Sequence, residues 1–169
     1  MTLHELLALF TSKNIEYTTA HLDAVDQNAQ LTDVASDSRE VTPGSLFVCK
    51  GAGFSPAYLA SAVEAGAAAY LCQQSLAEEL QAVAPNVAAI CVDDVRLAMA
   101  YAAAGVAGHP DKKLTTIGIT GTKGKSTCSY MLRAILDGDE SYSKCGVIGG
   151  IEVFDGKDTQ PAHNTTPGS

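Results

Sequence analysis

The stretch from Leu114 to Thr127 constrains the fold of this chain more than any other. It reads Leu-Thr-Thr-Ile-Gly-Ile-Thr-Gly-Thr-Lys-Gly-Lys-Ser-Thr, which predicts a buried strand, a glycine-rich turn and then a helix that begins at Gly-Lys-Ser. Gly121 and Gly124 let the backbone turn without a Cβ clash, so that successive N–H groups and a helix N-terminus can point at one anion. We therefore predict a phosphate cradle in an α/β fold.

Two side chains of this stretch are candidates for nucleotide chemistry. Lys125 would reach the β- and γ-phosphates, and the Ser126 hydroxyl would ligate Mg²⁺. The strict loop pattern has Gly where this chain has Ile119, and Gly-Lys-Ser alone also fits a tight turn with a surface lysine. The apolar strand before the loop and the apolar helix face after it favour nucleotide binding. That face comprises Cys128, Met131, Leu132, Ile135 and Leu136.

Composition excludes several classes of partner. The 169 residues carry a formal net charge of −8, which disfavours nonspecific binding to nucleic acid and to anionic membranes. No apolar run approaches the ~20 residues of a membrane span, and the N-terminus does not resemble a secretion signal. We therefore expect a monomeric cytoplasmic protein. Its five cysteines show no metal-binding spacing, and we interpret them as buried apolar side chains.

Helical and strand patterns alternate before the cradle. A capping box at Thr2 and Glu5 predicts a first helix, and a polar stretch follows it to about Gln30. The alternation predicts an α/β domain with parallel strands. We expect strands at 31–35, 45–50, 68–72 and 87–92, and helices at 56–65, 75–83 and 94–107.

The break Gly108-His109-Pro110-Asp111 predicts a domain boundary at about residue 110. Residues 111–169 would then begin a nucleotide-binding domain, with strands near 144–148 and 151–154 and a turn at Asp155-Gly156. Two or three strands cannot complete such a domain. We therefore expect the chain to be an N-terminal fragment.

Three stretches resemble the ATP-dependent Mur ligases, which build the peptide stem of the cell-wall precursor. They are Ser36-Asp37-Ser38-Arg39-Glu40-Val41-Thr42-Pro43-Gly44-Ser45-Leu46-Phe47-Val48, Gly118-Ile119-Thr120-Gly121-Thr122-Lys123-Gly124-Lys125-Ser126-Thr127, and His163-Asn164-Thr165-Thr166-Pro167. The family's cradle begins Thr-Gly-Thr, which accounts for Ile119, and many members have Asn in place of Lys123. Lys50-Gly51 and the Asn-Thr-Thr-Pro stretch look most like the branch that adds the third residue of the stem.

The resemblance implies site residues. Residues 1–110 would hold the UDP end of UDP-N-acetylmuramoyl-L-alanyl-D-glutamate, with Ser38 and Ser36 at positions that contact the uridine nucleotide; a capped turn with an exposed ion pair is the alternative interpretation there. Asn164, Thr165 and Thr166 match a loop near the muramoyl group. The ATP loop would comprise Thr120, Gly121, Thr122, Lys123, Gly124, Lys125 and Ser126.

The implied reaction is ATP-driven amide synthesis. The D-Glu carboxylate attacks the γ-phosphate, and the amine of a diamino acid, L-lysine or meso-diaminopimelate, then displaces phosphate from the acyl phosphate. Lys125 and Mg²⁺, held partly by Ser126, would stabilise the negative charge. We expect no ligation by the 169-residue chain alone. A Mur ligase adding another residue, an unrelated P-loop NTPase and a noncatalytic nucleotide-binding module are the alternatives.

Overall fold

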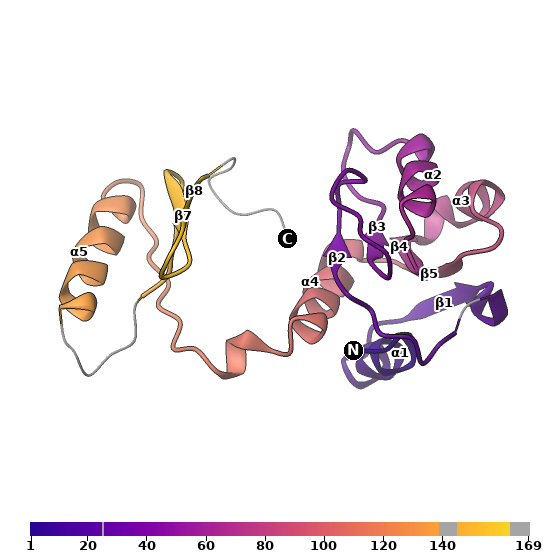
Figure 1. The fold of residues 1–169 in the computed structure, drawn as a ribbon, viewed down its shortest axis with the longest axis horizontal. Coiled ribbons are helices and arrows are strands. Elements are labelled where there is room, and N and C mark those ends of the chain that lie inside the picture. Colours follow the sequence, from indigo (N-terminus) through magenta and orange to yellow (C-terminus); the bar gives the residue numbers. More distant parts are fainter. Residues whose placement is uncertain (25, 139–144, 163–169) are drawn as a thin grey trace. The chain divides into compact units, whose positions relative to one another are not determined.

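The computed structural model describes residues 1–24, 26–138 and 145–162, which divide into two compact units (Figure 1). The first is Met1–Leu114, and the second begins at Thr115. No helix in the described ranges is long and apolar enough to cross a membrane.

The first unit is built on a five-stranded sheet with the order β1-β5-β4-β3-β2. Strands β2 to β5 are parallel, and β1 pairs antiparallel with β5 at one edge. The four predicted strands are confirmed, but the expectation of parallel pairing throughout is wrong because of β1. The strands are β1 (Tyr17–Ala20), β2 (Val34–Ala35), β3 (Leu46–Val48), β4 (Ala69–Gln73) and β5 (Ala88–Val92).

The sequence pattern did not predict β1, because only two of the four residues of this edge strand are partly buried. Tyr17 and Ala20 are partly buried, whereas Thr18 and Thr19 are exposed, so the segment has no apolar run. Backbone pairing with β5 and the packing of Tyr17 on Phe10, with ring centroids 6.2 Å apart, hold it in place. Such tertiary contacts decide the conformation of a short amphipathic segment more than its own propensity does.

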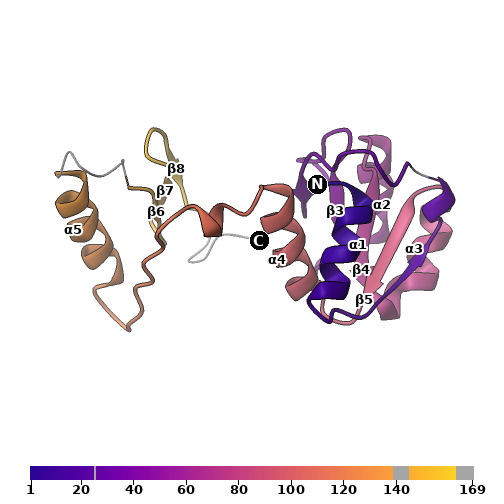
Figure 2. The ribbon, with the colours of Figure 1, turned by 90° about the horizontal axis from the view of Figure 1, so that it is seen from below.

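Four helices cover the two faces of this sheet, α1 and α4 on one face and α2 and α3 on the other (Figure 2). The capping box of α1 is confirmed, since the Glu5 N–H donates to Thr2 Oγ1 at 3.1 Å and the Thr2 N–H donates to Glu5 Oε2 at 2.8 Å. The helices are α1 (Leu3–Ser12), α2 (Pro56–Glu64), α3 (Ala77–Val83) and α4 (Val95–Val106), with short 3₁₀ turns η1 (Leu22–Ala24), η2 (Gln74–Leu76) and η3 (Pro110–Lys112).

Three buried cysteines form a row across β3, β4 and β5 on the α2/α3 side. Cys72 and Cys91 are directly paired in the sheet, with their Sγ atoms 3.6 Å apart, and Cys49 follows β3 on the same face. Tyr70, two residues before Cys72, is fully buried, and its hydroxyl has no hydrogen-bond partner in the described chain. A buried hydroxyl without a hydrogen-bond partner lowers the stability of the fold.

Replacing Tyr70 with phenylalanine should raise the free energy of unfolding by about 1 kcal/mol, because it removes a buried, unsatisfied hydroxyl and keeps the ring. Urea unfolding followed by circular dichroism measures the change. The matched control is Tyr58→Phe, since Tyr58 is 49% exposed and its hydroxyl can reach water. A loss of stability for Tyr70→Phe would show that its hydroxyl is satisfied in solution.

The second unit consists of an extended segment, one helix and a small antiparallel sheet of order β6-β7-β8. The predicted hairpin turn is confirmed, since Asp155 Oδ1 accepts hydrogen bonds from the N–H groups of Lys157 and Asp158, both at 2.8 Å. The predicted helix also begins where expected, at Lys125. The elements are α5 (Lys125–Asp137), β6 (Val147–Ile148), β7 (Glu152–Phe154) and β8 (Thr159–Pro161).

The buried strand predicted before the glycine loop is wrong. Residues 115–120 form no strand, and Leu114 and Ile117 are 65% and 57% exposed. A strand of this apolar kind needs partners on both edges and cover on both faces. Within the described ranges, β6, β7 and β8 pair only with one another.

Helix α5 packs through its polar face. The Arg133 guanidinium lies 3.5 Å from the centroid of the Phe154 ring and forms an ion pair with Asp137, which in turn accepts a hydrogen bond from the Cys145 N–H. The opposite, apolar face is solvent-exposed at Met131 and Ile135. The interpretation of all five cysteines as buried is therefore wrong for Cys128, which lies on that exposed face, and Cys145 is only partly buried.

Candidate functional site

The glycine loop before α5 has the backbone that the sequence predicts. Gly121 and Gly124 have φ angles of 153° and 79°, a region that residues with a Cβ rarely adopt. Gly124 is the N-cap of α5 and has no side chain to accept from the N–H groups of the first turn. These N–H groups, at the positive end of a 13-residue helix, can therefore donate to an anion.

Lys125 folds back over this loop, and its Nζ donates a hydrogen bond of 2.7 Å to the Gly121 carbonyl oxygen. A phosphate bound at the loop would compete with that carbonyl for the ammonium group. Ser126 lies in the first helical turn and is partly exposed. The structure thus brings the candidate nucleotide residues together in one exposed segment, 120–126.

A hydroxyl and phosphate oxygens are ligands that Mg²⁺ accepts, and protein sites for this ion commonly supply only one or two side chains. Ser126 fits that pattern as a single protein ligand. The described ranges contain no group of three or more His, Cys, Asp or Glu side chains that could hold a metal ion by themselves. Any Mg²⁺ at this loop would therefore be held mainly by the nucleotide.

Ser36 and Ser38 follow β2, so they lie at the carboxyl end of a parallel strand. Asp37 Oδ1 accepts from the backbone N–H of Arg39 at 3.0 Å, and its carboxylate also binds the Arg39 side chain. This hydrogen bonding lowers the pKa of Asp37 to about 2. The segment is thus the capped turn with an exposed ion pair that the alternative interpretation describes, and it leaves Ser36 exposed and Ser38 partly exposed.

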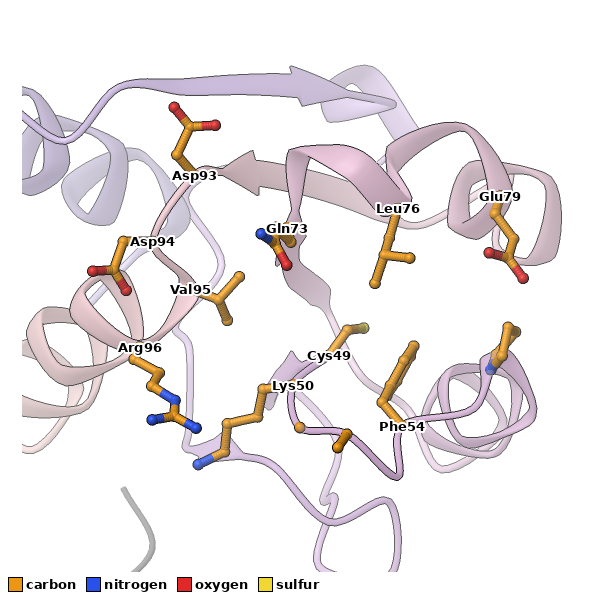
Figure 3. A pocket seen from close by; sticks show the side chains of 13 residues that line it. Cys49, Lys50, Phe54, Gln73, Leu76, Glu79, Asp93, Asp94, Val95 and Arg96 are labelled. Carbon is orange, nitrogen blue, oxygen red and sulfur yellow. The ribbon is translucent and has the colours of Figure 1, made fainter.

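A pocket of about 770 Å³ opens at the same edge of the sheet, where β3, β4 and β5 end (Figure 3). Ligands of open α/β sheets bind outside the carboxyl ends of parallel strands, and this volume suits a small organic ligand. Ser36 and Ser38 do not line it. The lining residues are Cys49, Lys50, Gly51, Ala52, Phe54, Pro56, Gln73, Leu76, Glu79, Asp93, Asp94, Val95 and Arg96.

Sequence reasoning missed most of this pocket. Its residues come from three separate segments, 49–56, 73–79 and 93–96, and no motif joins Phe54, Gln73 and Arg96. The prediction of parallel strands held the signal, because the carboxyl ends of parallel strands meet at one edge of a sheet. The third predicted group, Asn164, Thr165 and Thr166, lies outside the described residues.

No family model matches the chain. Comparison with curated proteins finds similarity to ligases that act on UDP-N-acetylmuramoyl peptides by their names. It is 36% identical over 170 residues to a UDP-N-acetylmuramoyl-L-alanyl-D-glutamate–2,6-diaminopimelate ligase of Oceanobacillus iheyensis, covering 99% of this chain and 31% of that protein. It is 37% identical over 145 residues to the ligase of the same name from Caldanaerobacter subterraneus, covering 84% and 28%. A UDP-N-acetylmuramyl-tripeptide synthetase of Latilactobacillus sakei is 38% identical over 127 residues, covering 75% and 23%.

The chain therefore spans less than a third of the length of these relatives. The similarity nonetheless extends over nearly all of its own residues and includes both the Asp-Ser-Arg turn and the glycine loop. The chain belongs to the Mur ligase family, in its UDP-N-acetylmuramyl-tripeptide synthetase branch.

Proposed function

We propose that this chain provides the UDP-substrate unit and the ATP loop of a ligase that adds a diamino acid to UDP-N-acetylmuramoyl-L-alanyl-D-glutamate. The observation that carries the proposal is the similarity over 99% of the chain to a ligase named for this substrate. Other relatives are named as tripeptide synthetases, so the proposal covers the class of diamino acids and not one member.

In this proposal the glycine loop binds the triphosphate of ATP. The N–H groups of the first turn of α5 and the Lys125 ammonium group would donate to phosphate oxygens, and Ser126 would hold Mg²⁺. Both chemical steps of acyl-phosphate ligation concentrate negative charge, so fixed donors at this position lower the barrier. Mg²⁺ supplies further neutralisation of the phosphates when it is bound.

The first unit would hold the other substrate by its nucleotide. Its parallel strands end at one edge, where both the Ser36–Ser38 turn and the pocket lie. Contacts from Asn164, Thr165 and Thr166 to the muramoyl group stay a prediction from the family motif.

Calorimetric titration with UDP-N-acetylmuramoyl-L-alanyl-D-glutamate tests the proposal. We expect saturable binding to the chain, and weaker binding of UDP-N-acetylglucosamine, which shares the UDP group but lacks the dipeptide. An unrelated P-loop NTPase would bind Mg²⁺·ATP and neither UDP sugar. That result would contradict the proposed substrate.

A further inference from the structure

Cys72 and Cys91 form a pair of thiols that the proposed function does not use. They are register partners in the parallel strands β4 and β5, and their Sγ atoms lie 3.6 Å apart. Both side chains are buried on the face of the sheet that α2 and α3 cover. The two cysteines are 19 positions apart in the sequence, and α3 lies in the segment that joins them. The sheet thus holds two free thiols against each other.

The backbone at this pair suits a disulfide. Neighbouring strands of a sheet lie about 4.8 Å apart, which is within the range of about 4.4–6.8 Å that the Cα atoms of a disulfide span. The two sulfur atoms already face each other, so a change in side-chain torsion angles can bring them to a bonding distance of about 2 Å. Cys49 continues the row on the other side of Cys72, where it follows β3.

The two thiols differ in reactivity. The Cys72 S–H donates to Cys91 Sγ. This hydrogen bond lowers the pKa of Cys91, and the side chains of Thr18 and Gln81 lower it further, against the opposing effect of burial. The same bond and burial raise the pKa of Cys72. Because the thiolate is the nucleophilic form, Cys91 reacts first with an electrophile, and Cys72 lies in place to react with the product.

Two side chains that reach the surface contact the Cys91 sulfur. Thr18 is the register partner of Cys91 in the edge strand β1 and is exposed, and Gln81 lies in α3 and is partly exposed. The sulfur is therefore only one side chain below the solvent. Movement of these two side chains admits a small neutral molecule more readily than a large or charged one. Their hydroxyl and amide groups can also hydrogen-bond the oxygen atoms of a peroxide.

We propose that Cys72 and Cys91 are a modification site at which a small hydroperoxide forms a reversible cross-strand disulfide. With hydrogen peroxide, the Cys91 thiolate attacks one oxygen, the O–O bond breaks, and the released hydroxide takes the proton that Cys91 lost and leaves as water. The product is a sulfenic acid on Cys91. The Cys72 sulfur then attacks the Cys91 sulfur, the S–O bond breaks, and the hydroxyl group leaves with the Cys72 proton as a second water. The thiols lose two electrons and the peroxide gains them, and a dithiol reverses the change by exchange.

This inference is independent of the proposed function, and treatment with hydrogen peroxide tests it. The chain carries Cys128→Ser and Cys145→Ser, which remove the two thiols that are not fully buried. We expect it to lose the mass of two hydrogen atoms and to yield, after proteolysis, a peptide that joins Cys72 to Cys91. Dithiothreitol should restore the original mass. Since the disulfide closes a loop around α3, the oxidised chain should unfold at a higher urea concentration than the reduced one.

Cys72→Ala in the same background prevents the disulfide and should leave a sulfenic acid on Cys91, which dimedone labels. The matched control is Cys49→Ala, since it removes a buried thiol from the same row and should leave the disulfide between Cys72 and Cys91 unchanged. Circular dichroism of each variant shows whether the fold is kept.

A disulfide that includes Cys49 would overturn the assignment of the pair. The proposal also fails if Cys72 and Cys91 stay reduced under a peroxide treatment that oxidises the exposed Cys128 of the unsubstituted chain. That comparison needs no substitution in the row, so it decides even where Cys72→Ala does not fold. Oxidation that occurs only in urea would show that the thiols react in the unfolded chain alone, which contradicts a site in the folded protein.

Discussion

Replacing Lys125 with alanine is expected to lower the affinity of the chain for Mg²⁺·ATP by about 10- to 100-fold, or to abolish measurable binding. The substitution removes the cation that lies over the glycine loop, 2.7 Å from the Gly121 carbonyl oxygen. A hydrogen bond to a charged group contributes about 1.5–3 kcal/mol, which gives the range above. Isothermal titration calorimetry with a nonhydrolysable ATP analogue measures the effect.

The control for this prediction is Lys157→Ala. Lys157 is exposed in the hairpin turn of the same unit, so its loss changes the net charge equally without touching the loop. Because Lys125 is also exposed, neither substitution should change folding. Equal affinity of Lys125→Ala and the unsubstituted chain would contradict the ATP loop assignment.

Replacing Leu71 with alanine is expected to destabilise the first unit by about 3–5 kcal/mol. Leu71 is fully buried in β4, the central strand of the sheet, where it packs under α1 and α4. Truncating a buried leucine loses the transfer free energy of its methyl groups and leaves a cavity. Since a domain of this size has about 5–15 kcal/mol in total, urea unfolding should show a large shift of the midpoint.

Leu114→Ala makes the same chemical change at a residue that is 65% exposed. We expect it to alter the unfolding free energy by less than about 0.5 kcal/mol. Similar losses for the two variants would mean that Leu71 is not in a packed core.

Elements with a strong local pattern could be predicted from the sequence. The capping residues of α1, the alternating strands and helices from β3 to α4, and the first residue of α5 all follow from side chains close to them in the chain. Edge strand β1 could not be predicted in this way, because its conformation depends on pairing with β5, more than 60 residues away. The prediction of a buried strand before the glycine loop was wrong for the converse reason. Its apolar residues have no partner strand in the described ranges.

The candidate sites divide in the same way. The glycine loop is contiguous, so its residues and their backbone geometry could be predicted together. The pocket depends on the meeting of several strand ends. Arg96 and Lys50 line the same pocket because β3 and β5 both lie beside β4 in the sheet, so their carboxyl ends are at the same edge. Local spacing in the sequence contains no such information. The functions of both sites stay proposals.

The outer strands of the five-stranded sheet are short, four residues in β1 and two in β2. An edge this brief exposes few unpaired backbone groups, so it offers little template for a strand from another molecule. Long, flat and apolar edges are the ones that seed fibrils. The first unit should therefore tolerate high protein concentrations without ordered aggregation, even though its core is rich in β-branched and aliphatic side chains.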